Sequence, residues 1–237
     1  DHASPALPQA YGDLGLSKDH FTRHIAYDIG AAALTEKLAT QFEAPALFTT
    51  FSRLLIDPNR GADDPTLVMR ISDRALIPGN AQIDEAEVAR RKRLYWQPYR
   101  DAIRNTTQAI KKTGCVPALI SIHSFTPIWR GHPRKWQAAV LWDCDDRLAK
   151  PLLQGLRALP VLVHVRRGVA SDVNRQLGRE TPFAAGRTTQ RGDRRLTRFH
   201  RRRREFARRD GVKNDGVLDR IEDRHVVGRI LRRPVQR

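Results

Sequence analysis

The chain has 237 residues, which is enough for one large α/β domain with a full core, or for a domain with an appendage. Its net charge of +17 is unevenly distributed. Residues 1–160 contain 21 basic and 17 acidic residues, whereas residues 161–237 contain 22 basic and 9 acidic residues. Two cysteines exclude a disulfide framework and fit a reducing compartment such as the cytoplasm, and no apolar run approaches the roughly 18 residues that a membrane span needs.

Predicted helices and strands alternate over the first two thirds of the chain. Asp84, with Glu87 three residues later, resembles a capping box that opens a long helix, and Pro98 should kink or break that helix near Gln97. The expected helices are 17–42, 84–112 and 145–158, and the expected strands are 45–51, 53–56, 116–122 and 137–142. This alternation predicts an α/β fold with a mostly parallel or mixed sheet and helices on both faces.

The composition changes after Pro160. Residues 161–237 contain 21 Arg and one Lys but no Trp or Tyr. We therefore divide the chain into an incomplete α/β domain at 1–158 and an Arg-rich tail at 159–237 that is expected to be poorly ordered, apart from one more strand at 161–165. Charge alone should give the tail weak, salt-sensitive binding to anions. A non-catalytic basic protein whose tail binds nucleic acid is the alternative function, although no specific nucleic-acid recognition is expected.

Two histidines could serve a metal. His123 follows the apolar run 116–122, so it should lie at the carboxyl end of a buried strand, and His2 lies in a polar loop at the start of the chain. A catalytic zinc takes about three protein ligands and leaves one position open, and neutral imidazole is a common ligand. The alternative is that each histidine only makes structural hydrogen bonds.

Several arginines could bind an anionic substrate, because a guanidinium matches a carboxylate with two parallel hydrogen bonds. Asn59 and Arg60 are the first candidates, although the sequence around them is also typical of a turn. Arg53 could meet a second substrate carboxylate or simply pair with Asp57. Arg134 is a further candidate for binding a substrate carboxylate. His24 and Asp28, four residues apart on the expected helix 17–42, could form a polar pair.

The motifs taken together resemble those of N-formylglutamate amidohydrolases. The motifs are Asp1-His2-Ala3-Ser4, 12–16 (Gly-Asp-Leu-Gly-Leu), 23–31, 52–60 with its Asp-Pro-Asn-Arg end, 77–80 and 123–127 (His-Ser-Phe-Thr-Pro). The resemblance implies a fold akin to the zinc carboxypeptidases and a bacterial, cytoplasmic enzyme of histidine degradation that uses Zn²⁺ to hydrolyse N-formyl-L-glutamate. It implies His2 and His123 as metal ligands and Asn59 and Arg60 as a carboxylate clamp. In the related carboxypeptidase pattern a Glu follows the first His by three residues, but Pro5 stands there, so Asp1 is the candidate third ligand.

The resemblance stops near residue 158. A first strand that normally precedes the Asp-His motif is missing, and so are a Gly-Asp-Asn-Glu-Pro-Tyr segment and a final strand that carries the family's Glu base and an Arg. No catalytic base is therefore assigned, and the resemblance implies that this chain has severely reduced or no activity. An Arg-rich replacement that begins abruptly is typical of GC-rich DNA translated in the wrong frame, which the nucleotide sequence would test.

Overall fold

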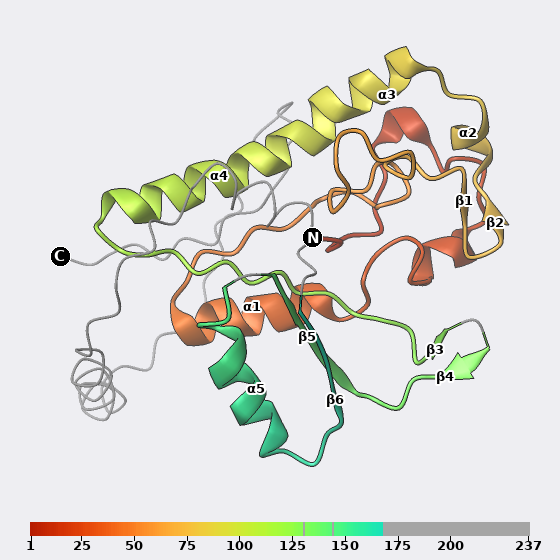
Figure 1. Cartoon of the computed structure of the whole chain (residues 1–237). Coiled ribbons are helices and arrows are strands. Elements are labelled where there is room, and N and C mark those ends of the chain that lie inside the picture. The colour runs from red at the N-terminus through yellow and green to blue at the C-terminus, as the bar shows by residue number, and fades with distance from the viewer. Residues whose placement is uncertain (130, 144, 168–237) are drawn as a thin grey trace, which may run out of the picture. The chain divides into compact units, whose positions relative to one another are not determined.

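The computed structural model describes residues 1–129, 131–143 and 145–167, which form a mixed structure of helices and short strands within one compact unit (Figure 1). The helices are α1 (Ala31–Phe42), α2 (Pro78–Ala81), α3 (Glu85–Arg91), α4 (Gln97–Lys112) and α5 (Ala149–Arg157), with 3-10 turns at Gln9–Tyr11 and Lys18–Thr22 and a π-helical turn at Lys92–Trp96. The strands are β1 (Ile71–Ser72), β2 (Ala75–Leu76), β3 (Ile128–Trp129), β4 (His132–Pro133), β5 (Ala138–Trp142) and β6 (Val163–Arg167).

The described strands form three separate pairs and not the single large sheet that the sequence predicts. The pairs β1–β2 and β3–β4 are short antiparallel hairpins, and β5 pairs with β6 in parallel, with Val140 opposite Val165. Helix α5 connects β5 to β6 and buries Ala149 and Leu153 against Val140. This β-α-β unit confirms the strand expected at 137–142 and the helix expected at 145–158. The strand expected at 161–165 forms as β6, two residues later than predicted.

Three predicted strands, at 45–51, 53–56 and 116–122, do not form among the described residues. The segment 116–122 makes no ladder with any described strand, and Val116 and Ile120 are exposed, because no neighbouring strand covers them. At 45–56 only Thr49 makes an isolated bridge, and residues 53–55 turn.

Side chains take the place of a ladder in this second segment. Leu54, Leu55 and Ile56 are fully buried, and buried backbone polar groups need partners. The Ser52 hydroxyl accepts from the Leu54 N–H, and the Asn80 amide donates to the Leu54 carbonyl. The apolar run is therefore buried as a turn and not as a strand.

The helix predicted at 17–42 is broken in the middle. Gly30 adopts a left-handed conformation, with a φ of 82°, immediately before α1 begins. The preceding residues are tied to other parts of the chain, since the Ala26 carbonyl accepts from the Arg53 N–H and the Asp28 N–H donates to the His2 carbonyl. These long-range hydrogen bonds compete with helical ones, so the break places Asp28 beside the first loop.

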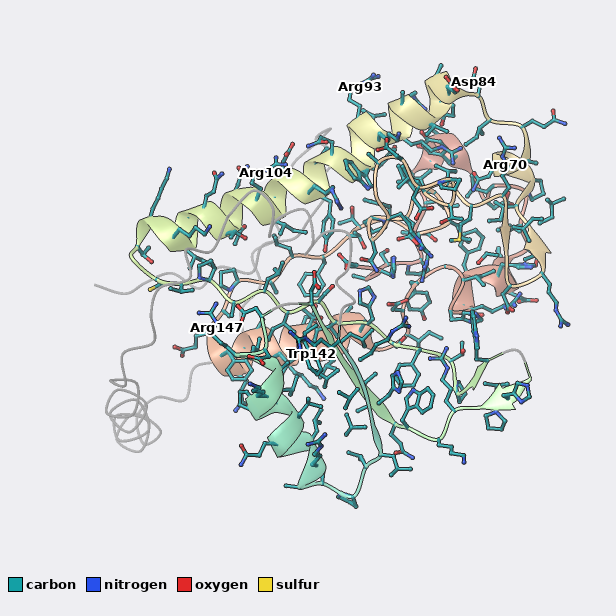
Figure 2. The ribbon with its side chains drawn as sticks, viewed as in Figure 1. Arg70, Asp84, Arg93, Arg104, Trp142 and Arg147 are labelled. Carbon is teal, nitrogen blue, oxygen red and sulfur yellow. The ribbon has the colours of Figure 1, made fainter. Side chains whose placement is uncertain are left out.

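The helix predicted at 84–112 forms as a continuous run from α3 to α4 (Figures 1 and 2). Asp84 caps it by accepting from the Glu87 N–H at 2.8 Å, and Gly114 follows its end with a φ of 79°. The π-helical turn ends at Trp96, directly before Gln97 and Pro98, so the proline interrupts the α-helical pattern where expected. No described helix is long and apolar enough to cross a membrane.

The core around residues 51–56 depends on one buried polar residue. Asn80 is fully buried, and its amide donates to the carbonyls of Leu54 and Met69, both at 2.8 Å. Its side-chain oxygen accepts from the Arg91 guanidinium at 2.7 Å, and Arg91 is itself 2% exposed. Asn80 thus has a structural role beyond the simple turn that the sequence indicates.

Replacing Asn80 should destabilise the fold. Asn80→Ala would leave two buried carbonyls and part of a buried guanidinium without a partner, so we expect the free energy of unfolding to fall by about 3 kcal/mol. Urea denaturation measures this difference. Asn105→Ala on the exposed side of α4 is the matched control and should change stability by no more than about 0.5 kcal/mol. Equal effects of the two substitutions would contradict this role.

Candidate metal centre

Two imidazole rings meet at a single carboxylate oxygen. The Oδ2 atom of Asp28 lies 2.7 Å from Nδ1 of His123 and 3.2 Å from Nδ1 of His2. The two ring centroids are 5.2 Å apart, and one ligand atom from each of the three residues lies within 4.8 Å of the other two. Residues that are 26 and 95 positions apart along the sequence therefore converge on one point.

Each of the three residues comes from a different non-helical segment. His2 lies in the first loop, where its carbonyl accepts from the Asp28 N–H at 2.9 Å. Asp28 lies in the break before α1, and His123 lies in the segment that joins α4 to β3. The break at Gly30 is thus what frees the Asp28 side chain to meet both histidines.

A second carboxylate holds the outer nitrogen of each ring. Oδ1 of Asp57 lies 2.7 Å from Nε2 of His2, and Oδ2 of Asp1 lies 3.1 Å from Nε2 of His123. Each Nε2 can donate to its carboxylate, and in that tautomer of the neutral ring the lone pair on Nδ1 would be left for a metal ion beside Asp28. In this structure Nδ1 of His123 hydrogen-bonds to the Asp28 carboxylate at 2.7 Å.

Asp57 is fully buried and well satisfied. It accepts from His2, from Nη2 of Arg53 at 2.8 Å and from the Asn59 N–H at 2.9 Å. Burial alone would raise the pKa of this carboxyl, but the hydrogen bond from His2 and the charges of His2 and Arg53 outweigh it and hold the pKa well below its usual range. Asp57 is therefore an ionised anchor that fixes the His2 ring.

Asp1 occupies the corresponding position beside His123. Its carboxylate accepts from the Ser121 hydroxyl at 2.7 Å and from the Tyr99 hydroxyl at 3.1 Å. Burial raises the pKa of Tyr99, which keeps this phenol neutral and able to donate. With three donors around it, the Asp1 carboxylate is suited to orienting His123.

The central carboxyl is ionised as well. Burial alone would raise the pKa of Asp28, but its contacts with the rings of His123 and His2 outweigh burial and hold the pKa well below its ordinary value. Arg53 adds a contact of 3.4 Å from Nη1 to the other Asp28 oxygen. The centre therefore contains three closely spaced carboxylates with Arg53 as their main fixed cation.

The donor set fits a divalent metal ion. Two neutral imidazoles and one carboxylate match the three protein ligands of a catalytic zinc. Nδ1 of His2 supports this fit, because the atom is buried and makes no hydrogen bond with any described residue, although it lies 3.2 Å from Oδ2 of Asp28. A buried ring nitrogen without a hydrogen-bond partner costs free energy unless a ligand takes its lone pair.

The structure brings His2 and His123 together with Asp28, and Asp1 as the third ligand stays a prediction. Asp28 completes the group that could hold a metal, and Asp1 lies on the opposite nitrogen of His123. The predicted pairing of Asp28 with His24 is wrong, since no helix forms there and His24 lies 3.7 Å from Asp73. The signal in the sequence was the glycine at position 30, which can end a helical pattern.

The arginine candidates separate into two kinds. Arg53 pairs with Asp57 through Nη2 and with Asp28 through Nη1, so the pairing alternative holds, while its buried Nε has no hydrogen-bond partner among the described residues. The Arg60 side chain is 43% exposed, and within the described part of the chain its ion pairs are long, 3.8 Å to Asp57 and 3.7 Å to Asp64. The side-chain oxygen of its neighbour Asn59 is buried and has no hydrogen-bond partner among residues 1–129, 131–143 and 145–167. Turn geometry at 59–60 therefore coexists with an unpartnered Asn59 side-chain oxygen and an Arg60 guanidinium in two long ion pairs, as far as the described residues show.

Arg134 follows the β3–β4 hairpin and makes no ion pair with any described residue. Its guanidinium carbon lies 5.1 Å from the centre of the Phe125 ring and 5.6 Å from that of Trp129. Thr126 donates its hydroxyl hydrogen bond to the Ile128 carbonyl, so this hydroxyl serves the local backbone. The predictions for the tail beyond residue 167 lie outside the described residues.

The sequence and the fold both match known proteins. The family model described as N-formylglutamate amidohydrolase (FGase) matches residues 1–209. The chain belongs to this family. The match continues past residue 158, where the resemblance by motifs ends, and it covers every residue of the centre described above.

A solved structure supports the fold. The chain is similar to the crystal structure of gene product Atu2144 from Agrobacterium tumefaciens, with 34% sequence identity and a TM-score of 0.69. The alignment covers 77% of this chain and 73% of that protein. No curated protein matches the chain. The α/β class is thus supported, and the carboxypeptidase-like arrangement of the sheet stays a prediction.

Metal titration separates the ligands from the residues that orient them. Removing a ligand by Asp28→Asn should weaken zinc binding by more than about 100-fold, whereas Asp1→Asn or Asp57→Asn should weaken it about 10- to 100-fold. Calorimetric titration of zinc into metal-free protein measures these constants, with His20→Ala as the control, because His20 is a half-buried histidine hydrogen-bonded to Ser17. A larger loss for Asp1→Asn than for Asp28→Asn would make Asp1 the third ligand.

Proposed function

We propose that this protein is a metal-assisted amide hydrolase whose substrate is N-formyl-L-glutamate and whose products are L-glutamate and formate. The observation that carries the proposal is the meeting of His2 and His123 at Asp28 in a chain of the N-formylglutamate amidohydrolase family. We further propose that the reaction belongs to histidine degradation in the bacterial cytoplasm, in keeping with the two cysteines of the chain.

His2, Asp28 and His123 would hold the ion, and zinc is the metal that this donor set suits best. Such an ion supplies Lewis-acid activation of an amide carbonyl and of water near neutral pH. Asp57 and Asp1 would accept a hydrogen bond from Nε2 of His2 and His123, and this would leave the Nδ1 lone pair of each ring for the ion. Arg53 offsets part of the negative charge of Asp57 and Asp28 and so keeps both carboxylates ionised side by side.

The pair Asn59 and Arg60 would bind the α-carboxylate of the substrate. The backbone of this turn is held by Asp57, whose Oδ1 accepts from the backbone N–H of Asn59 and also hydrogen-bonds to Nε2 of His2. The clamp is therefore connected to the metal ligands through one buried carboxylate. This connection would set the distance between the carboxylate of the substrate and its formyl amide.

Loss of the clamp should weaken substrate binding. For Arg60→Ala we expect the Kd of N-formyl-L-glutamate to rise by about tenfold or more, because a charged hydrogen-bond partner of the α-carboxylate is lost. Calorimetry on the zinc-loaded chain measures this Kd. Arg93→Ala, which removes an exposed arginine of the π-helical turn, is the matched control (Figure 2). Unchanged affinity in Arg60→Ala would place the α-carboxylate elsewhere.

A carboxylate base normally takes a proton from water and passes it to the leaving amine. The described glutamates are not suited to this role, since Glu87 pairs with Arg91 and the others are exposed in or beside α1 and α3. The three aspartates at the centre are occupied by imidazole or arginine partners. We therefore propose that this chain binds its substrate but turns it over slowly.

Formate release tests the proposed reaction directly. With zinc supplied, we expect release from N-formyl-L-glutamate to be far slower than for a complete member of the family, and to vanish in His123→Ala. Matched samples with and without a chelator give the metal-dependent part of the rate. Turnover equal to that of a complete member would contradict the absence of an effective base, and release that survives His123→Ala would contradict the proposed centre.

A further inference from the structure

Thr49 is a buried threonine whose hydroxyl contacts the backbone on both sides of His2. It is 2% exposed, and it lies outside the motifs through which the chain resembles the family. The hydroxyl donates to the Asp1 carbonyl and accepts from the Ala3 N–H at 3.1 Å. A buried hydroxyl costs free energy unless it is hydrogen-bonded, and this one is bonded both as a donor and as an acceptor. One side chain therefore ties the first loop to a segment that lies far along the sequence.

These two contacts fix the backbone conformation of His2. The Asp1 carbonyl belongs to the planar peptide group before the His2 Cα atom, and the Ala3 N–H belongs to the peptide group after it. Because Oγ1 of Thr49 bonds to both planes, it restricts both backbone dihedrals of His2. The Ala3 N–H also donates to the Asp1 carbonyl at 2.7 Å, and the His2 carbonyl accepts from the Asp28 N–H at 2.9 Å. The direction in which the imidazole leaves the backbone is therefore set.

The segment that carries Thr49 is itself held in place by packing. Phe48 and Ala46 are buried together with Ala39 of α1, and Ala3 packs against this cluster. A β-branched side chain such as threonine has few χ1 rotamers, so the hydroxyl has little freedom once the backbone of its segment is packed. The first loop thus contacts a packed surface through the Thr49 hydroxyl and the Ala3 methyl group.

The remaining freedom of His2 lies in its side chain, and Asp57 restricts it. Oδ1 of Asp57 lies 2.7 Å from Nε2, at the end of the ring that faces away from Asp28. With the backbone held by Thr49 and the ring by Asp57, Nδ1 lies 3.2 Å from Oδ2 of Asp28 before any ion binds. A group that is ordered in advance loses less conformational entropy when its ligand binds.

We propose that Thr49 is a positioning residue for metal binding, whose hydroxyl fixes the His2 backbone so that Nδ1 points at the ion. This assignment rests on the metal-assisted function proposed above, and it adds a residue that supplies no ligand atom. Loss of the hydroxyl would release the two peptide groups that flank His2, while all three ligand side chains and both orienting carboxylates would remain in the chain.

The test compares threonine with an isosteric residue that lacks the hydroxyl. Calorimetry measures the Kd of zinc for the full metal-free chain and for Thr49→Val. We expect Thr49→Val to weaken zinc binding by about tenfold, the lower end of the effect of residues that orient metal-binding histidines. Thr49→Ser keeps the hydroxyl and loses only the methyl group, so its Kd should stay within about threefold of that of the unchanged chain, below this range.

Thr35→Val is the matched control. The Thr35 hydroxyl donates to the Ala31 carbonyl at 2.8 Å within α1, so this substitution removes a similar hydrogen bond that does not involve the first loop. It should leave the Kd of zinc unchanged. Urea denaturation of the metal-free chains gives the free energy of unfolding of each variant, which separates weaker zinc binding from partial unfolding.

Equal zinc Kd values for Thr49→Val and Thr35→Val would overturn the role of Thr49 while leaving the metal centre in place. A Thr49→Ser variant that binds zinc as weakly as Thr49→Val would do the same, because the hydroxyl would then not matter. If the unchanged chain did not bind zinc, the proposed function and this assignment would both fall. Should Thr49→Val fail to fold, Thr49→Ala and Thr49→Ser, which differ only in the hydroxyl, give the same comparison.

Discussion

The structure depends on one oxygen atom of Asp28 that two imidazole nitrogens approach together. Bringing a carboxylate and two histidines to one buried point costs conformational entropy and solvation, and each group must then find partners. The chain meets this requirement with Asp57 and Asp1, which take the outer nitrogens of His2 and His123. The non-helical course of 23–30 follows from the same constraint, since a helix there would carry Asp28 away from the first loop.

Local patterns allowed the helices of the central region to be predicted well. Asp84, Pro98 and Gly114 act within one or two turns, through a cap, a missing N–H and a left-handed residue, so the predicted helix 84–112 needed only a π-helical turn as correction. Strands at 45–56 and 116–122 could not be assigned in this way. An apolar run indicates that a segment can be buried, but it does not indicate which strand, if any, will pair with it.

The residues of the site that could be predicted were those whose type alone suggests a metal ligand. His2 and His123 stood out as imidazoles in polar clusters, whereas Asp28 was hidden by a helical spacing that placed it opposite His24. The state of each arginine was equally hidden, because only the fold shows that Arg53 is paired with two carboxylates and that Arg134 faces two aromatic rings. Spacing along the chain gives candidates, and tertiary contacts decide which of them are occupied.

The π-helical turn at Lys92–Trp96 sets the rotational phase between the two halves of one long helix. On the first half Arg91 reaches Asn80, and on the second Tyr99 reaches Asp1. A wider turn changes the direction of every later side chain, and each residue of an α-helix corresponds to about 100° of rotation. Shortening this turn by a single residue would therefore swing Tyr99 away from Asp1, so that a backbone irregularity far from the ligands governs the alignment of His123.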